Sequence, residues 1–542
     1  MTAMRDGPRK EKLSIYLARE GFQDYGFPLK QEMVEVAHHI PVDCEEAIVF
    51  IKKEPPSKTP AWAHLLTEHP GAPEMKFGKS ASVGAVLLIK LERRVFLISF
   101  GSGFHLIHPE SMERDFGLRV TLNAVEPDKL RSLDKASYDD SPLSSRTQST
   151  TQSDIFDLQA NSESDLVYAV TGACRFPILG SHITGRDALT LMVETDIPGI
   201  LPILTKALQL FREPLPSVYS WIDNVARVRD PDTLNLLDLL LDDLIKRDGE
   251  GNLWMGEPEI VDWESNAGYS FDMRPNTPRH QVLQISDLRE YIESKGIEFC
   301  LSTIKSSTVH INNSEYNSIR SWSAYRCLYA EISEGDDRFT LRNGAWFRIE
   351  SDFIKRIDDS LTKIPVITNS LPIYSFANEG EYNQHASNLI DDLHLMDKNN
   401  IQLGGPLDKI EFCDLIEGSE NFIHVKYYRS SATLSHLFAQ GLTAAEAFVK
   451  DEAFRQRLNK KLPQSIALKD AKSRPNASNY TITYAIATNK SIPSELPFFS
   501  KVSLKNAASQ LLALGYQVKI TAIPIDPQLP LIKKQKPKKQ PL

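Results

Sequence analysis

The sequence predicts a multidomain mixed α/β (α+β) protein, and three observations lead to this class. The chain has 542 residues, which corresponds to roughly three domains at about 150 residues each. Hydrophobic residues make up 41% and charged residues 25%, as is usual for a soluble globular protein. Segments rich in Val, Ile and Leu alternate with segments in which leucine recurs at helical spacing. We therefore expect strands and helices around several cores that need no disulfide or metal to fold.

Charge and cysteine content exclude several classes of protein. Lys and Arg total 62 and Asp and Glu total 71, which gives a formal net charge of −9. This balance excludes a protein covered in positive charge, although a local basic groove remains compatible with it. The five cysteines form no CxxC pair, so a zinc ribbon or a redox dithiol lacks support. No apolar run approaches the length of a membrane span, and the charged N-terminus lacks the apolar centre of a signal peptide. We expect a cytoplasmic protein without membrane contact.

The N-terminal part, residues 1–136, reads as an α+β domain. Residues 13–17 and 47–51 are strand-like, and residues 83–90 and 95–100 form the pattern of a hairpin around a charged turn. A short helix followed by a strand is expected within residues 112–125. Next comes a segment in which 9 of the 17 residues 137–153 are Ser or Thr. Since little of it can be buried, we expect residues 137–160 to be a loop or linker.

A middle α+β domain is expected at residues 161–370. Leu234, Leu237, Leu241 and Leu244 stand at helical spacing, and Asp232 is placed to cap that helix. The polar residues 264–280 predict a second loop. At the other end of the chain, residues 526–542 close with KKQKPKKQPL, a lysine-rich stretch containing proline that predicts a basic, disordered tail.

The most informative segment is residues 409–441, KIEFCDLIEGSENFIHVKYYRSSATLSHLFAQG. Residues 410–416 and 422–428 read as two strands joined by a turn, and residues 431–440 as a helix. Strand alternation places Ile423 and Val425 on one face, and His424 and Lys426 on the other, with Asp414 beside them on the hairpin partner. Upstream, residues 378–397, NEGEYNQHASNLIDDLHLMD, read as a helix in which Glu379, Glu381 and His385 lie near each other. Downstream, residues 480–523 read as strand, helix, strand and extend or cover this core.

An acid and a lysine on neighbouring strands suit divalent-metal hydrolysis of phosphodiester bonds. Mg²⁺ takes carboxylate oxygens together with several waters, and it neutralises charge on the scissile phosphate. A lysine supplies positive charge where negative charge builds up in the reaction. The pattern therefore favours a nuclease site that uses Mg²⁺ or Mn²⁺.

This order of elements resembles the PD-(D/E)XK nuclease superfamily: a helix carboxylate, a strand Asp, a strand (D/E)xK and a helix with a polar residue. The resemblance implies a restriction-endonuclease-like core in a domain spanning residues 371–525. It assigns the helix carboxylate, a second candidate metal ligand, to Glu381, the metal-binding acid to Asp414, the lysine to Lys426 and the polar residue to Gln440.

His424 departs from the superfamily pattern, because it stands where Glu or Asp is usual. Imidazole binds metals, but Mg²⁺ prefers oxygen. Glu411 is a further candidate metal ligand, although regular strand alternation would turn it away from Asp414. Three residues that follow the second strand are candidates for binding substrate: Arg429, Ser430 and Ser431. The two serines are also candidate caps of the following helix.

A wider resemblance covers nearly the whole chain. The stretches ERDFGLRVTLN, SSATLSHLFAQG and LPFFSKVSLKNAASQLLALGYQVKI look like a sporadically distributed bacterial family of unknown function, associated with mobile and phage-defence loci. The resemblance implies an anti-phage or mobile-element defence setting. Together with the nuclease pattern it favours a nuclease that cleaves DNA, with RNA left open as a substrate. It leaves open a phage-derived trigger or partner protein, and an oligomer.

Two other functions remain open from the sequence. One is a nucleic-acid or protein-binding module with a degenerate nuclease fold, which the His424 departure favours. The other is a toxin of different chemistry in the N-terminal half. That function would require a pocket within residues 101–119 lined by His105, Glu113 and Arg114.

Overall fold

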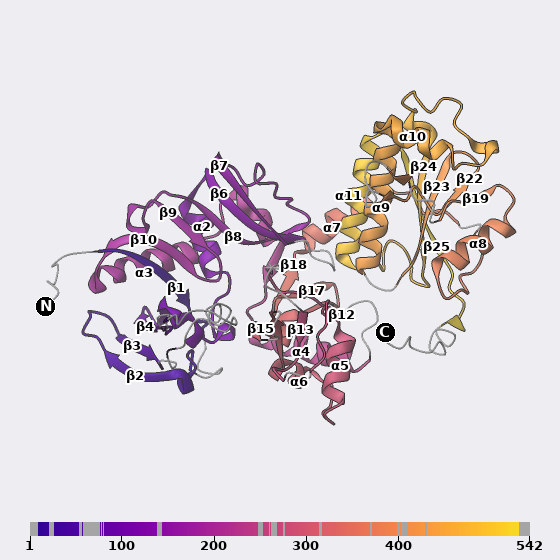
Figure 1. Ribbon diagram of the computed structural model, residues 1–542. Coiled ribbons are helices and arrows are strands. Elements are labelled where there is room, and N and C mark those ends of the chain that lie inside the picture. Colours follow the sequence, from indigo (N-terminus) through magenta and orange to yellow (C-terminus); the bar gives the residue numbers. More distant parts are fainter. Residues whose placement is uncertain are drawn as a thin grey trace. The chain divides into compact units, whose positions relative to one another are not determined.

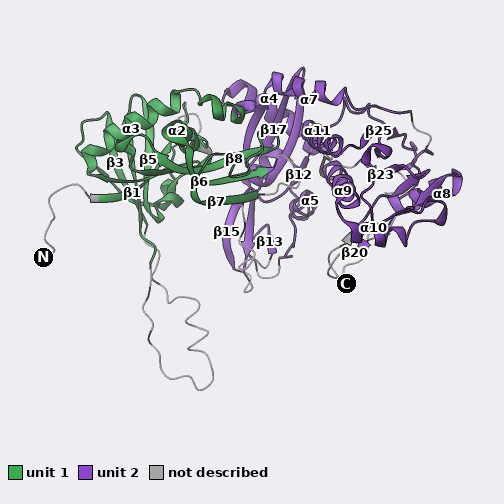
Figure 2. Ribbon diagram, turned by 90° about the horizontal axis from the view of Figure 1, so that it is seen from above, with its two compact units in different colours: residues 1–136, 144–222 green, residues 137–143, 223–542 purple. Residues whose placement is uncertain are grey.

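The chain forms two compact units in the computed structural model, residues 1–136 with 144–222 and residues 137–143 with 223–542 (Figure 2). Helices and strands are mixed throughout, which confirms the predicted class. The structure describes residues 9–20, 27–53, 57, 76, 79, 81–137, 144–247, 253–259, 261, 268–274, 277–313, 317–368, 371–397, 401–402, 409–428 and 431–529. Among these residues, no helix combines the length and the apolar character needed to cross a lipid bilayer.

The first unit is built on a ten-stranded sheet of order β2-β3-β4-β5-β1-β10-β9-β8-β6-β7. Helices α2 (Phe116–Ala124) and α3 (Ile197–Arg212) contribute to its core. The predicted hairpin is confirmed, because β4 pairs antiparallel with β5. The strands are β1 (Arg9–Leu17), β2 (Val34–His39), β3 (Glu46–Lys52), β4 (Gly84–Leu91), β5 (Arg94–Gly101), β6 (Val125–Ser137), β7 (Ser144–Ser153), β8 (Asp165–Cys174), β9 (His182–Gly185) and β10 (Leu189–Thr195).

The boundaries of this unit differ from the predicted ones. Strand β1 pairs antiparallel with β10, so residues up to 222 belong with the N-terminal strands rather than with a middle domain starting at 161. The Ser/Thr-rich segment also differs, because residues 144–153 form the edge strand β7 paired with β6. An edge strand with little buried surface tolerates polar side chains, and Arg146 bonds the buried Asp134 at 2.7 and 2.6 Å. The rest of the predicted linker is partly outside the described residues.

The second unit begins with two small sheets and four helices. The first sheet has the order β11-β18-β17-β16-β12 and the second the order β13-β14-β15. The strands are β11 (Val225–Arg227), β12 (Leu253–Met255), β13 (Gly268–Ser270), β14 (Thr308–Asn312), β15 (Ser318–Ser323), β16 (Leu328–Glu334), β17 (Asp337–Arg342) and β18 (Ala345–Ile349). The helices are α4 (Pro231–Lys246), α5 (Ile285–Glu293), α6 (Leu301–Ser306) and α7 (Ser351–Leu361).

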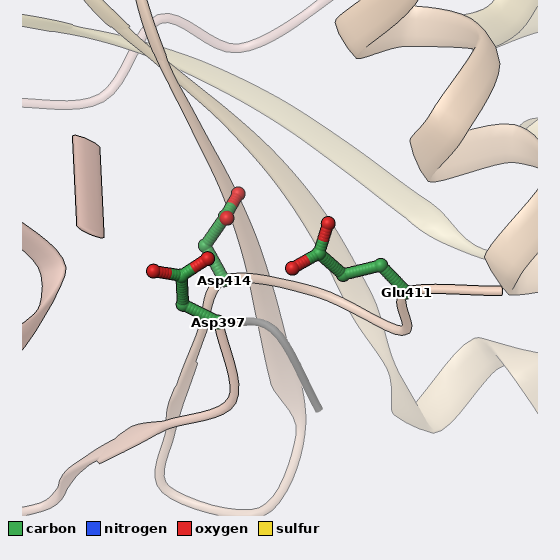
Figure 3. Close-up of side chains that lie close together, drawn as sticks. All are labelled: Asp397, Glu411 and Asp414. Carbon is green, nitrogen blue, oxygen red and sulfur yellow. The ribbon is translucent and has the colours of Figure 1, made fainter. Parts of the chain in front are cut away.

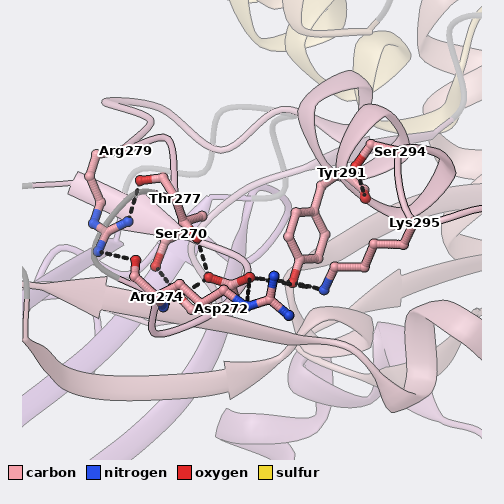
Figure 4. A network of polar contacts seen from close by, with 8 residues as sticks. All are labelled: Ser270, Asp272, Arg274, Thr277, Arg279, Tyr291, Ser294 and Lys295. Atoms are coloured by element: carbon pink, nitrogen blue, oxygen red, sulfur yellow. Dashed lines mark hydrogen bonds and ion pairs between the residues drawn. The ribbon is translucent and has the colours of Figure 1, made fainter.

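Two local predictions in this part need correction. The predicted helix is α4, but its cap is Asp230, whose carboxylate accepts from the Thr233 amide at 2.8 Å. Pro231 takes the first helical position, so Asp232 lies inside the first turn. The predicted loop 264–280 contains β13, and Asp272 ties it to α5 by accepting from the hydroxyl of Tyr291 at 3.0 Å (Figure 4).

The C-terminal part holds a five-stranded sheet of order β19-β22-β23-β24-β25 (Figure 1). Strands β19 (Leu393–Leu395), β22 (Leu415–Glu417) and β23 (Asn421–Tyr427) pair antiparallel, whereas β23, β24 (Thr481–Ala487) and β25 (Gln517–Ile523) pair parallel. A two-stranded ribbon, β20 (Ile401–Gln402) and β21 (Lys409–Ile410), lies between β19 and β22 in the sequence. Strands β24 and β25 extend the sheet, as the sequence predicts.

Helices cover both faces of this sheet (Figure 1). Helix α8 (Glu379–Leu389) packs its buried face on Ile423 and Val425. On the opposite face lie α9 (Ser431–Lys450), α10 (Glu452–Asn459) and α11 (Phe498–Ala513). The chain remains packed up to Leu529, which is fully buried, so the predicted tail does not begin at 526. Residues 530–542 lie outside the described residues.

Helix α9 approaches the sheet closely at Gly441. A Cβ atom on this residue would lie 2.7 Å from a ring carbon of Tyr484 on β24, well inside van der Waals contact. The Tyr484 hydroxyl donates to the carbonyl of Phe438, one turn earlier in α9, at 3.0 Å. Glycine at position 441 therefore sets the spacing between α9 and the sheet.

Candidate metal centre

Strand pairing brings three acidic residues from separate segments together. Asp397 follows β19, Glu411 follows β21, and Asp414 directly precedes β22. The backbone amides of Met396 and Asp397 donate to the carbonyl of Asp414 at 2.8 and 3.0 Å, which extends the pairing of β19 with β22. The segment that carries Asp397 is thereby fixed against the segment that carries Asp414.

The three side chains form the acidic group of the candidate centre (Figure 3). One carboxylate oxygen from each of Asp397, Glu411 and Asp414 lies within 4.8 Å of the other two. Around an octahedral Mg²⁺ ion, neighbouring oxygens lie about 3 Å apart and opposite ones about 4.2 Å apart, so the three carboxylates would have to move closer together to bind one ion. All three donors are hard oxygens, the type that Mg²⁺ and Mn²⁺ prefer. The residues present therefore fit such a cation.

Asp414 is the most buried member of the group, at 9% exposure. Its Oδ2 accepts from the backbone amide of Val425 on β23 at 2.7 Å, and its Oδ1 lies 3.5 Å from the side-chain nitrogen of the buried Asn383 on α8. Burial raises the pKa of Asp414 to about 8, with the nearby Glu411, Asp397 and Glu379 adding to the rise against the opposing hydrogen bond from Val425. At neutral pH and without a cation, Asp414 is therefore mostly protonated.

Glu411 joins the group because its segment is not a regular strand. Residues 411–413 leave the sheet, and Phe412 packs its ring against Phe422 and Phe448 at centroid distances of 4.6 and 5.3 Å. The strand predicted at 410–416 is wrong over these residues, and with it the alternation that would turn Glu411 away from Asp414. Gln440 on α9 donates to the Glu411 carboxylate at 2.9 Å.

Lys426 pairs with a helix carboxylate, but not with the one that the resemblance assigns. Its ammonium group lies 2.8 Å from the Glu379 carboxylate, which also accepts from the Tyr427 amide at 3.1 Å. Glu381 is exposed, and its backbone amide is capped by Asn378 at 2.9 Å. Glu379, two residues before Glu381 on α8, is thus the helix carboxylate that pairs with Lys426, and the group of three acids includes neither Glu379 nor Glu381.

His424 lies outside the acidic group. It is 1% exposed, and its ring lies 5.9 Å from that of Tyr484 on the α9 side of the sheet. Neither ring nitrogen has a hydrogen-bond partner among the described residues. Burial lowers the pKa of His424 to about 4, so the ring is neutral at physiological pH. The oxygen donors come instead from Asp397 and Glu411.

The remaining predicted site residues are only partly placed. Arg429 and Ser430 lie outside the described residues, and Ser431 begins α9 without a described side chain. Asp397 was missed by the sequence reasoning. The helix predicted at 378–397 is wrong over its last part, because α8 ends at Leu389 and residues 393–395 form β19, so Asp397 follows a strand and not a helix.

The residues named for a site in the N-terminal half are engaged elsewhere. Glu113 is buried with Arg94 at 3.5 Å, and Arg114 lies 3.1 Å from Asp187. His105 is exposed and stacks on Phe104 at a centroid distance of 4.0 Å. The charges of Glu113 and Arg114 thus serve ion pairs within the fold.

The fold and the acidic group define a mixed α/β protein with a candidate cation site in its C-terminal part. Residues 13–524 match the model of a family described as of unknown function (DUF6119), and the chain belongs to this family. No curated protein and no solved structure matches the chain.

Proposed function

We propose that the C-terminal part of the chain, residues 371–525, is a divalent-metal-dependent nuclease that hydrolyses phosphodiester bonds, in DNA rather than RNA. The observation that carries the proposal is the convergence of Asp397, Glu411 and Asp414 within 4.8 Å, beside the strand that presents Lys426. Carboxylate oxygens gathered around one point are suited to a hard divalent cation. A fixed lysine near such a site is suited to a reaction that builds negative charge.

The order of elements supports this assignment. A helix carboxylate on α8, an aspartate before β22, a lysine on β23 and a polar residue on α9 follow the order of the PD-(D/E)XK superfamily. Glu379 takes the helix position, and Gln440 takes the position on the following helix. His424 still departs from the pattern, and we propose that Glu411 and Asp397 supply the oxygen ligands that it does not.

Each residue then has a distinct task. Asp397, Glu411 and Asp414 would hold Mg²⁺ or Mn²⁺, which when bound polarises the scissile phosphate and acidifies a water molecule. Lys426 places its positive charge against the developing negative charge, and Glu379 holds its ammonium group in position. Gln440 orients the Glu411 carboxylate. His424 is neutral and forms part of the buried wall behind the strand.

We also propose the biological setting that the sequence resemblance implies, an anti-phage or mobile-element defence role with a phage-derived trigger or partner. A second candidate function is a binding module that has lost catalysis. The buried, unpartnered His424 at the usual place of a metal-binding acid favours it. The two functions differ in one respect, because only the nuclease requires the cation.

The test incubates the purified protein with linear DNA, circular DNA and RNA, each with Mg²⁺, with Mn²⁺ or with a chelator. Asp414→Ala and Lys426→Ala are assayed in parallel, and Asp391→Asn is the control. Asp391 is an exposed acid between α8 and β19, so its neutralisation changes the charge without touching the acidic group.

The nuclease predicts cation-dependent cleavage by the parent and by Asp391→Asn. Cleavage should be lost in Asp414→Ala and lowered about 100-fold in Lys426→Ala. Equal cleavage by all four proteins would place the activity elsewhere or in a contaminant. Binding of DNA without cleavage under any cation would favour the binding module.

A further inference from the structure

A short segment of the C-terminal part is strongly basic. Residues 455–474 contain seven Lys or Arg and one Asp, a net charge of 7 − 1 = +6. Since the whole chain carries −9, the remaining residues carry −9 − 6 = −15. Charge segregated in this way marks a surface for a partner of opposite charge.

Most cations of this segment are exposed, and hydrogen bonds hold the backbone that carries them. All but Arg455 are exposed, namely Arg457, Lys460, Lys461, Lys469, Lys472 and Arg474. Arg455 itself is 3% exposed and donates to the carbonyls of Phe448, Val449, Ala471 and Lys472 at 3.0 to 3.2 Å. A buried arginine that holds four backbone carbonyls fixes residues 471–472 against the end of α9.

A second pair of contacts fixes the middle of the segment. The Asn459 side chain donates to the carbonyl of Leu468 at 3.1 Å and accepts from its amide at 2.6 Å. A ligand therefore meets charges whose backbone is already ordered, which lowers the entropic cost of binding.

Four of these cations make no ion pair within the described part of the chain, and we call them the basic platform: Lys460, Lys469, Lys472 and Arg474. Asp470, the one acid of the segment, accepts from the backbone amides of Lys472 and Ser473 and from the Ser473 hydroxyl. These hydrogen bonds hold the Asp470 carboxylate in a local turn near Lys472, and its single negative charge leaves the segment at a net +6.

The platform adjoins the candidate metal centre through α10. Phe454 of α10 packs on Phe412 at a centroid distance of 6.0 Å, and Phe412 lies between Glu411 and Asp414 in the chain. Helix α10 also packs against β20, whose partner β21 leads directly into Glu411 (Figure 2). A polyanion on the platform would therefore lie close to the acidic group.

We propose that the basic platform binds the phosphate backbone of duplex DNA and guides it to the metal centre. The inference rests on the proposed nuclease function and names its substrate-binding surface. Lysine and arginine that neutralise phosphates release counterions, so such binding does not depend on sequence and weakens steeply with salt.

The test measures fluorescence anisotropy of a labelled duplex DNA with the full-length Asp414→Asn protein in chelator, so that no cleavage interferes. Lys469→Gln/Lys472→Gln is compared with Lys355→Gln/Lys363→Gln, which removes the same charge from exposed lysines at α7. The platform pair is expected to weaken binding at least about tenfold and to reduce the log–log salt slope by about 2, since each phosphate contact contributes about 0.9. The α7 pair is expected to leave both unchanged.

Equal effects of the two pairs would overturn the proposal, because net charge alone would then explain binding. Competition by polyglutamate as strong as that by DNA, or binding of RNA in preference to duplex DNA, would also overturn it. The nuclease is judged separately, with the unsubstituted protein and Mg²⁺. If DNA binding depends on the platform but no DNA is cleaved, the binding surface is supported and the nuclease is rejected. If DNA is cleaved but its binding does not depend on the platform, the nuclease is supported and the binding surface is rejected.

Discussion

The ammonium group of Lys426 lies 2.8 Å from the carboxylate of Glu379, and the same carboxylate accepts the backbone amide of Tyr427 at 3.1 Å. One acid at the start of α8 thus holds both the side chain of Lys426 and the backbone beside it. This contact joins the helix to the end of β23 and fixes the lysine that we assign to the reaction.

Removing the charge of Glu379 is expected to lower kcat without changing KM. In Glu379→Gln the lysine loses its ionic partner, and we expect a loss of about tenfold. Lys426→Ala, which removes the charge itself, is expected to lose about 100-fold. Steady-state cleavage assays measure both. Glu381→Gln, on the same helical turn but exposed, is the control, and an equal loss there would show that Glu379 has no special role.

Cation affinity is expected to rise with pH up to about pH 8. The raised pKa of Asp414 means that a cation must displace a proton below this pH. The apparent Kd for Mn²⁺ should fall about tenfold for each pH unit between 6 and 8 and level off above. Calorimetry in buffers of different ionisation enthalpy should detect about one proton released per ion at pH 7. Binding without proton release would contradict this protonation state.

The free protein is expected to be more stable when Asp414 is replaced by Asn. Burial raises the pKa of Asp414 from its usual value near 3.8 to about 8, so the folded protein binds this proton more tightly than the unfolded chain does. Stability then falls as pH rises from about 4 to about 8. An amide cannot ionise, and it keeps an acceptor for the Val425 amide.

Thermal melting in chelator tests this expectation. At pH 8 the Tm of Asp414→Asn should exceed that of the parent, by about 2–4 °C for each kcal/mol gained in stability. Near pH 4 the two proteins should have the same Tm. Addition of Mn²⁺ should raise the Tm of the parent alone. A variant that melts lower at pH 8 would show that the carboxylate is not destabilising.

Gln440 is expected to tune cation affinity through Glu411. Gln440→Leu removes the 2.9 Å hydrogen bond that orients the carboxylate, and we expect the Kd for Mn²⁺ to rise about tenfold. Gln440→Glu should weaken binding further or change its pH dependence, because it places a second carboxylate beside the first. Titration calorimetry gives both values. Gln456→Leu on α10, whose amide bonds only the exposed Glu452 among the described residues, is the control and should leave affinity unchanged.

Loss of the buried Arg455 is expected to loosen the segment that carries the basic platform. In Arg455→Met the carbonyls of Ala471 and Lys472 lose their donor. Hydrogen exchange at residues 460–474 should therefore become faster, while exchange in β24 stays slow. Arg457→Met, at an exposed position on the same helix, should leave the exchange pattern as it is. Unchanged protection in Arg455→Met would mean that the segment is held by other contacts.

Periodicity predicted the parts of the fold in which burial follows a regular pattern. Alternation in β23 correctly separated Ile423 and Val425, which pack with α8, from His424, which lies near Tyr484 on the other face. Lys426 was predicted to point the same way as His424, but its ammonium group pairs with Glu379 on α8. The helices α4, α8 and α9 were also predicted from periodicity. The predicted pairing of residues 83–90 with 95–100 is also confirmed. A short turn between two strands favours their antiparallel pairing as a hairpin.

The acidic group and strand β7 depend on contacts between separate segments, which sequence patterns do not reveal. Glu411 faces Asp414 because Phe412 is drawn into an aromatic cluster, which breaks the alternation. Asp397 joins them through the pairing of β19 with β22 across a long connection. The Ser/Thr-rich composition of β7 predicts a linker because it shows that little of the segment is buried. Composition does not show whether the backbone of such a segment pairs with the edge of a sheet, as β7 pairs with β6.

Gly441 has no side chain, yet it acts as a spacer for the candidate metal centre. Its missing side chain lets α9 settle against Tyr484, and Gln440, the preceding residue, then reaches Glu411. A methyl group at 441 would lift this turn of the helix and carry the Gln440 amide away from the acid that it orients. The position of the Gln440 amide at the candidate metal centre thus depends on how closely α9 packs against the sheet at Gly441.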